Sequence, residues 1–178
     1  MADNIIEFKN ISKHFGGTTA LDQVTFEVEK GTVVGLVGEN GAGKSTLVKI
    51  TGGVLSPDEG RIIYDGQEVS INSPKNAEEI GISIVHQELP ICENLTVAQN
   101  IFLGADLPGK GMFPDRKYMY NKSLELFEQL DIKLDPDKPV SECSMGERQL
   151  IIIASAISKN SKFILMDEPT TALSPSEV

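Results

Sequence analysis

The sequence predicts an α/β fold whose core is interrupted by an all-helical insertion. Strand-like segments dominate the N-terminal part, helix-like segments fill residues 87–157, and a strand-like segment returns at Phe163–Met166. A glycine-rich loop, "GENGAGKST", also stands between a strand-like and a helix-like segment. We therefore expect three regions, at residues 1–87, 88–157 and 158–178, the first and third of which build one core.

The first thirty residues are expected to form β-strands. In "VTFEV", Val24, Phe26 and Val28 alternate with polar residues, as is typical of a half-buried antiparallel strand. The next segment, Thr32–Gly38, does not alternate, and this pattern predicts a strand that is buried on both faces. After the glycine-rich loop, "KSTLVKIT" predicts a helix that ends at Gly52–Gly53.

The following elements are indicated by turn and capping residues. Asp65-Gly66, between two β-prone runs, predicts a hairpin. Ser73-Pro74 predicts the start of a short helix that continues to Ile80, and "GISIVH" predicts a further buried strand. In the middle of the chain "NLTVAQNIFLG", "RKYMYNKSLELFEQL" and "GERQLIIIASAI" predict helices, and Ala105–Asp115 predicts a surface loop.

Composition limits the possible functions. The chain has 178 residues, enough for one domain, and a net charge of −10, which argues against a protein that mainly binds nucleic-acid backbones. Cys92 and Cys143 are too few for a disulfide framework and favour a reduced, intracellular compartment. The acidic start, "MADNIIEFKN", does not resemble a signal peptide, and the longest apolar run, Leu150–Ile157, is too short to span a bilayer.

The glycine-rich loop fits the phosphate-binding pattern G-x-x-x-x-G-K-[ST]. Its backbone N–H groups can point into one concavity at a helix N-terminus, where Lys44 can reach β- and γ-phosphates. The Ser45 hydroxyl can bind Mg²⁺, and Thr46 can reach the α-phosphate. The alternative is a glycine-rich turn without a ligand. The candidate nucleotide-binding residues of the loop are Gly38, Asn40, Gly41, Ala42, Gly43, Lys44, Ser45 and Thr46.

Two carboxylates follow the last predicted strand. A phosphate loop requires a metal ligand and a base, and both are commonly carboxylates at the end of a neighbouring buried strand. Asp167 is the candidate for holding Mg²⁺ through its water shell, and Glu168 for polarising the attacking water. The alternative is that Asp167-Glu168-Pro169 only caps the next turn.

The helix "GERQLIIIASAI" has a serine at its start. Ser144 and Glu147, three residues apart, predict a capping box, and apolar residues follow at helical spacing. This capping role explains the segment fully. The functional alternative is that Ser144 and the Gly146 amide face a second anion.

Taken together, these residues resemble the nucleotide-binding domain of an ABC transporter. The phosphate loop, "HQ" at His86-Gln87, "CSMGERQ" at the signature position and "FILMDEPTTALS" follow one another in the order of that family. The resemblance covers essentially the whole chain and is strongest to importers of ribose, xylose, galactose and similar sugars. "GRIIYDGQEV", "SPKNAEEIGISIVHQEL" and "LTVAQNIFLG" resemble that subgroup in particular.

The resemblance implies a fold and a set of site residues. The fold would be a P-loop NTPase core of the RecA-like type, with an N-terminal antiparallel β subdomain and an inserted helical subdomain. Phe15 would stack on the adenine of ATP, although it could also be a core phenylalanine. Gln87 would touch Mg²⁺ and sense the membrane subunit. Ser144, Met145 and Gly146 would contact the γ-phosphate of ATP bound to an opposite nucleotide-binding domain.

The implied activity is ATP hydrolysis that drives sugar import. Its catalytic residues would be Glu168, Gln87 and Lys44, and its Mg²⁺ ligands would be Ser45, Gln87 and Asp167. Transmembrane permease subunits and a second nucleotide-binding domain, either a tandem half or a dimer partner, would be direct partners. An extracytoplasmic sugar-binding protein would be an indirect one.

The implied location is peripheral, on the cytoplasmic face of the membrane. Two alternatives remain open: an ABC-type ATPase without a transport role, and a module that binds nucleotide without hydrolysing it.

The sequence departs from the family pattern in three places. The signature normally begins Leu-Ser-Gly-Gly-Gln, whereas Cys143–Glu147 reads Cys-Ser-Met-Gly-Glu and places a negative charge near the phosphate site. Ser174 replaces the usual aspartate of the D-loop. The switch histidine and a central parallel strand would follow beyond Val178, which suggests the front fragment of a longer protein. We expect such a fragment to close its sheet, self-associate or exchange strands with another copy.

Overall fold

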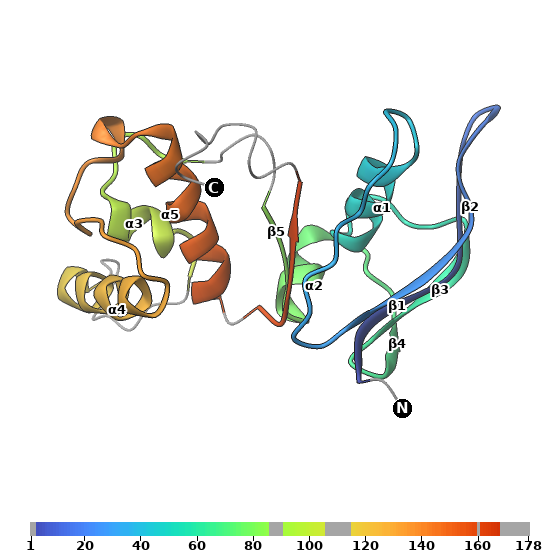
Figure 1. Cartoon of the computed structure of the whole chain (residues 1–178), viewed down its shortest axis with the longest axis horizontal. Helices are drawn as coiled ribbons and strands as arrows, with labels where there is room; N and C mark the ends of the chain where they lie inside the picture. Colours follow the sequence, from blue (N-terminus) through green and yellow to red (C-terminus); the bar gives the residue numbers. More distant parts are fainter. Residues whose placement is uncertain (1–2, 86–90, 106–114, 160, 168–178) are drawn as a thin grey trace. The chain divides into compact units, whose positions relative to one another are not determined.

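The computed structural model describes residues 3–85, 91–105, 115–159 and 161–167 (Figure 1). The chain divides into two compact units, Met1–Ile84 and Val85–Val178. Within the described ranges, no helix is both long enough and apolar enough to cross a membrane.

The first unit contains a four-stranded antiparallel sheet. Its strands, in the order β2-β1-β3-β4, are β1 (Asn4–Phe15), β2 (Thr18–Glu29), β3 (Glu59–Tyr64) and β4 (Gln67–Val69). Ile6, Phe8 and Ile11 of β1 are buried, and the Phe8 ring stacks on Phe26 of β2 with ring centroids 4.6 Å apart. The predicted half-buried strand at Val24–Val28 is confirmed as part of β2.

The predicted hairpin at Asp65-Gly66 connects β3 to β4. Tyr64 pairs with Gln67, so the loop has two residues, and their φ angles are +49° for Asp65 and +77° for Gly66. Two consecutive positive φ angles are typical of the type I′ turn, whose twist matches that of antiparallel strands. The pair Asp-Gly tolerates this backbone, which explains why the turn was readable from the sequence.

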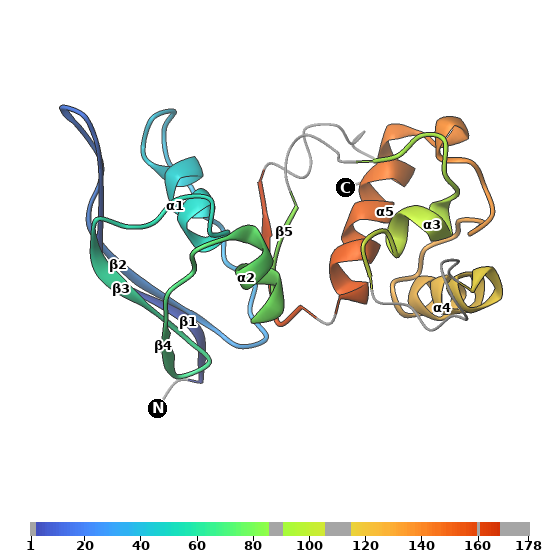
Figure 2. The same cartoon turned by 180° about the vertical axis from the view of Figure 1, so that it is seen from behind.

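Two helices lie on the same side of this sheet in both views (Figures 1 and 2). The first, α1 (Lys44–Thr51), ends at Gly52, as predicted. The second, α2 (Pro74–Glu79), begins after Ser73, whose hydroxyl accepts a hydrogen bond of 3.1 Å from the Asn76 N–H. Pro74 occupies the first turn, where its missing N–H is not needed.

The predicted buried strand at Thr32–Gly38 is wrong. This segment is irregular, pairs with no described strand, and has exposed fractions of 101% at Val33 and 93% at Val37. A strand with two apolar faces requires neighbouring strands and covering layers, which the described part of the first unit does not provide. The apolar pattern indicated a segment suited to burial, but it did not indicate whether partner strands lie beside it.

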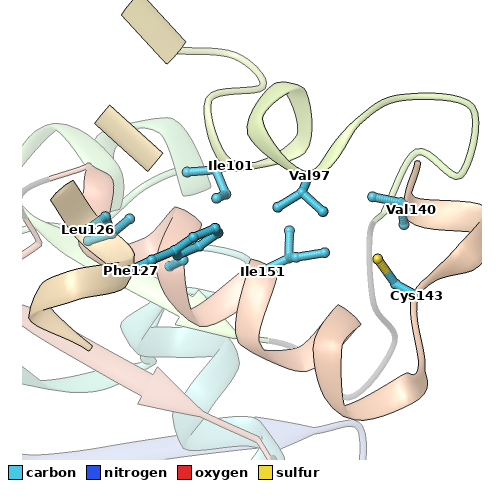
Figure 3. Close-up of a cluster of buried hydrophobic side chains, with 8 residues drawn as sticks. Val97, Ile101, Leu126, Phe127, Val140, Cys143 and Ile151 are labelled. Carbon is cyan, nitrogen blue, oxygen red and sulfur yellow. The ribbon is translucent and has the colours of Figure 1, made fainter. Parts of the chain in front are cut away.

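The helical part of the second unit encloses a separate apolar core. Its helices are α3 (Val97–Ile101), α4 (Arg116–Gln129), the short 3₁₀ helix η1 (Val140–Glu142) and α5 (Met145–Ser158), which confirms the helical character predicted for this region. Figure 3 shows how their side chains meet. The buried cluster consists of Val97, Ile101, Leu126, Phe127, Val140, Cys143, Ile151 and Ala154.

Two short strands were predicted at the correct places. They are β5 (Ile82–Val85) and β6 (Phe163–Met166), which pair in a two-stranded sheet. Most of the loop predicted at Ala105–Asp115, namely residues 106–114, lies outside the described residues.

Candidate functional site

The phosphate-loop sequence forms a tight turn that leads into α1. Gly41 and Gly43 have φ angles of +87° and +88°, and the Ala42 N–H donates a hydrogen bond of 3.1 Å to the Glu39 carbonyl oxygen. A Cβ atom on Gly43 would lie 2.5 Å from the carbonyl oxygen of Ala20 in β2. Only glycine therefore satisfies both the backbone angle and the space at this position.

The Lys44 side chain bends back over this loop. Its Nζ donates hydrogen bonds to the carbonyl oxygens of Gly38, at 2.6 Å, and Glu39, at 2.9 Å. The first turn of α1 contains no acidic residue, and Ser45 is exposed there. The Lys44 ammonium, the N–H groups at the start of α1 and a first turn without acidic residues together suit an anion such as a phosphate chain.

Phe15 lies at the end of β1 and is not a core residue. Its exposed fraction is 46%, and Lys13 Nζ lies 5.8 Å from the centroid of its ring. Asp58 fixes this end of the strand, because its carboxylate accepts hydrogen bonds from Lys13 Nζ at 2.6 Å and from the His14 N–H at 2.7 Å. These two bonds, that from Lys13 foremost, lower the pKa of Asp58.

In the second unit, the predicted capping box at the start of α5 is present. The Ser144 hydroxyl accepts a hydrogen bond of 3.2 Å from the Glu147 N–H, and the Ser144 N–H donates one of 2.7 Å to Glu147 Oε2. Gly146 is buried in this first turn, whereas Met145 is exposed. The capping role of Ser144 is thus confirmed, and its contact with a second anion remains a proposal.

Charged side chains surround this helix start. Lys138 Nζ donates to both carboxylate oxygens of Glu147, at 2.7 Å and 2.9 Å. Arg148 donates to Glu93 Oε1 at 2.6 Å through Nη1 and to the Cys143 carbonyl oxygen at 3.2 Å through Nε. The hydrogen bond from Lys138 is the main cause that lowers the pKa of Glu147.

Asp167 directly follows β6, as the sequence predicted. Its N–H donates a hydrogen bond of 2.9 Å to the Val85 carbonyl oxygen, and the residue is half-buried. Glu168 and Gln87 lie outside the described residues, as do His86 and Ser174. Among the residues that are described, no three histidine, cysteine or acidic side chains gather as a metal site.

The candidate residues are thus distributed over both units. Phe15 and the loop that carries Lys44 belong to the first unit, whereas Ser144, Gly146 and Asp167 belong to the second. Sequence reasoning missed Asp58 and Lys138. Asp58 acts 44 residues away from His14 in the sequence, and Lys138 lies nine residues before Glu147, so neither pair gives a local pattern.

Comparison with known proteins agrees with the motifs. The sequence model of the ABC transporter family matches residues 21–171. The galactose/methyl galactoside import ATP-binding protein of Fusobacterium nucleatum is 49% identical over 174 residues, which make up 98% of this chain and 35% of that protein. The chain thus spans about a third of the length of the curated relatives it matches.

Solved structures show the same fold. The ADP conformation of an ATP-binding cassette of an ABC transporter has a TM-score of 0.85 and 32% identity, covering 98% of this chain and 72% of that one. A dimeric cassette bound to ADP and Pi, in a post-hydrolysis state, has a TM-score of 0.75 and 25% identity, covering 97% and 77%. The fold is therefore that of a P-loop ATPase cassette, and this chain belongs to the ABC transporter family.

Proposed function

We propose that this chain binds and hydrolyses ATP as part of an ABC importer for a simple sugar. The observation that carries this proposal is the loop of residues 38–44, which turns into α1 with the Lys44 ammonium held over its carbonyl oxygens. The sugar class is inferred from a relative named for galactose and methyl galactoside import.

The loop supplies what a triphosphate requires. The N–H groups at the start of α1 and the Lys44 ammonium attract the phosphate oxygens, with no acid in the first turn to oppose them. The exposed ring of Phe15 is available for stacking on adenine. The nucleotide-binding residues would be Phe15, Gly38, Asn40, Gly41, Ala42, Gly43, Lys44, Ser45 and Thr46.

Mg²⁺ would be held by Ser45, Gln87 and Asp167. A hydroxyl, an amide oxygen and a carboxylate are hard oxygen donors of the kind that this ion prefers. When bound, the ion would neutralise charge that builds up on the phosphate oxygens. Asp167 suits this position because its hydrogen bond to Val85 fixes the backbone at the end of β6.

Hydrolysis would use the residue that follows Asp167. The Glu168 carboxylate would accept a proton from water while the water oxygen bonds to the γ-phosphorus and the bond to ADP breaks. Lys44 would bind the γ-phosphate oxygens, and Gln87 would help to orient the water. Membership of an ATPase family supports the reaction class.

The complete site would form between this chain and a second nucleotide-binding domain. Ser144 and Gly146 would contact the γ-phosphate of ATP bound by a second nucleotide-binding domain, consistent with the dimeric cassette that resembles this chain. Permease subunits would be contacted through the Gln87 segment on the cytoplasmic face of the membrane, with a sugar-binding protein on the other face. Of the three regions expected from the sequence, residues 1–87 would then bind the nucleotide. Residues 88–157 would contact the ATP of the second domain through the signature residues, and residues 158–178 would bind the metal ion.

The test separates binding from hydrolysis in the full-length protein. Glu168→Gln is expected to keep ATP–Mg²⁺ binding and to lose steady-state phosphate release, because Gln cannot accept the proton. Glu128→Gln, on α4, is the matched control and should behave like the unsubstituted protein. Unchanged phosphate release in Glu168→Gln would remove this role from Glu168. Binding without phosphate release in the unsubstituted protein would favour a nucleotide-binding module instead.

A further inference from the structure

A carboxylate lies at the start of α5, where the proposed contact of Ser144 and Gly146 with a phosphate would take place. Glu147 is the third residue of α5, and its Oε2 accepts the Ser144 N–H at 2.7 Å. A phosphate that approaches Ser144 therefore meets a negative charge at the helix start. Like charges repel, and the repulsion between this carboxylate and a phosphate would grow as water is displaced from between them.

The same helix start keeps donors for an anion. The Glu147 N–H donates to the Ser144 hydroxyl and the Arg148 N–H to the Ser144 carbonyl oxygen. The N–H groups of Met145 and Gly146 make no such bond to any other residue in the described part of the chain. Donors that point out of a helix start attract anions unless a nearby charge cancels them.

Lys138 cancels the Glu147 charge by direct contact. Its Nζ lies 2.7 Å and 2.9 Å from the two carboxylate oxygens, and each of the two side chains is only 28% exposed. The Lys138 backbone is itself fixed, because its carbonyl oxygen accepts the Val97 N–H at 3.0 Å and its N–H donates to Asp135 at 3.1 Å. The ammonium is thus supplied from a segment anchored on α3.

Arg148, a second cation at the start of α5, does not serve this purpose. The Arg148 guanidinium is bound by the Glu93 carboxylate at 2.6 Å and by the Cys143 carbonyl oxygen at 3.2 Å. Its charge is therefore already balanced. The Lys138 ammonium, which bonds both carboxylate oxygens, is therefore the principal counter-charge to Glu147.

We propose that Lys138 is a positioning residue that neutralises Glu147 and thereby lets the start of α5 accept a phosphate. This role rests on the proposed contact of Ser144 and Gly146 with ATP held by a second domain. Lys138 holds the Glu147 carboxylate in its capping position, where the carboxylate accepts the Ser144 N–H. The N–H groups of Met145 and Gly146 then remain for the phosphate. Removing the ammonium exposes the incoming phosphate to an uncompensated carboxylate.

The substitution Glu147→Gln allows a sharp test, because Gln also completes a capping box but carries no charge. In the full-length protein, Lys138→Ala is expected to lower kcat for ATP hydrolysis about three- to thirtyfold. ADP lacks the γ-phosphate, so calorimetry should give an unchanged affinity for ADP. Lys138→Arg should retain the rate, and Glu147→Gln in the Lys138→Ala background should restore it. Lys122→Ala, which breaks another ion pair in the second unit, is the control.

Two results would overturn the role of Lys138. One is an unchanged kcat in Lys138→Ala. The other is a double variant, Lys138→Ala with Glu147→Gln, that is as slow as Lys138→Ala alone. If Lys138→Ala does not fold, the single variant Glu147→Gln is compared with the double variant. The two should have the same kcat, and a slower double variant would contradict the proposal. Failure of the unsubstituted protein to bind ADP or ATP would instead overturn the proposed nucleotide site, and this inference with it.

Discussion

At the scale of single residues, backbone angle and available space decide which side chains the phosphate loop can contain. Gly43 needs a φ of +88° and lies against β2, so that an added Cβ would be 2.5 Å from Ala20 O and 2.6 Å from Leu21 Cδ2. In the sequence motif, glycine at this position is explained by phosphate binding. The structure adds a second reason, close packing against β2, which cannot be inferred from the spacing of the motif residues.

Gly43→Ala is therefore expected to lower the free energy of unfolding by about 1–3 kcal/mol or more, because it combines an unfavourable φ with a backbone clash. Urea denaturation measures this change. Gly17→Ala is the matched control, since nothing lies within 4 Å of a Cβ at Gly17. Equal stability of the two variants would contradict the close approach of the loop to β2.

The two cysteines differ in their surroundings. Cys143 is buried in the helical core, and this burial is the main cause that raises the pKa of its thiol, whereas Cys92 is exposed. Alkylation requires the thiolate and access to solvent. Iodoacetamide at mildly alkaline pH should modify Cys92 well before Cys143, as peptide mass spectrometry can measure. Equal rates at both residues would show that the core around Cys143 opens readily.

The Glu147–Lys138 pair should make stability depend on pH. The pKa of Glu147 is lowered in the folded state, chiefly by Lys138, so its contribution is present above the unfolded pKa of about 4.3 and is lost as pH falls through the folded pKa. Thermal unfolding of the unsubstituted protein and Glu147→Gln should therefore differ most near about pH 7 and converge near about pH 3. A difference that stays constant over this range would contradict the ionic contribution.

At the scale of elements, local signals in the sequence predicted most of the fold. Asp65-Gly66 fixed a two-residue hairpin, Ser73-Pro74 fixed the start of α2, and Ser144 with Glu147 fixed the start of α5. Each of these signals acts within four residues. The prediction of a strand at Thr32–Gly38 was wrong because a strand buried on both faces depends on partner strands that are remote in the sequence. The contacts of Asp58 and Lys138 were missed for the same reason.

The start of α3 tests this local logic. The Thr96 hydroxyl accepts the Gln99 N–H at 3.3 Å, and Gln99 Oε1 accepts the Thr96 N–H at 2.9 Å. Thr96→Ala should reduce the free energy of unfolding by about 0.5–2 kcal/mol, and Thr96→Ser should restore most of it. Chemical denaturation of the three proteins checks this; a Ser variant as unstable as the Ala variant would assign the loss to packing of the methyl group instead.

At the scale of the whole molecule, two compact units each contain part of the candidate nucleotide chemistry. The first unit supplies the phosphate loop and Phe15, and the second supplies Asp167 and the capped start of α5. The family match over residues 21–171 spans both. Motif order along the chain therefore predicted the family, whereas the charge pairing of Glu147 with Lys138 is visible only in the structure.

The exposed segment Thr32–Gly38 gives a prediction at this scale. Lysine at Val33 and Val37 together should change the free energy of unfolding by less than about 1 kcal/mol, because neither side chain is buried. Val28→Lys is the matched control, since Val28 is buried in β2 and a lysine there should cost several times more. Strong destabilisation by the pair at 33 and 37 would show that these side chains are buried in solution.

The most direct test of the central claim is calorimetric titration of the full-length protein with ATP and Mg²⁺. In the proposed site Lys44 would supply a charge-assisted bond to the phosphates, so Lys44→Ala should weaken binding roughly tenfold or more. Lys49→Ala, an exposed residue in the last turn of the same helix, should bind like the unsubstituted protein. Binding that is absent from the unsubstituted protein, or equal in the Lys44 and Lys49 variants, would contradict a nucleotide site at residues 38–46.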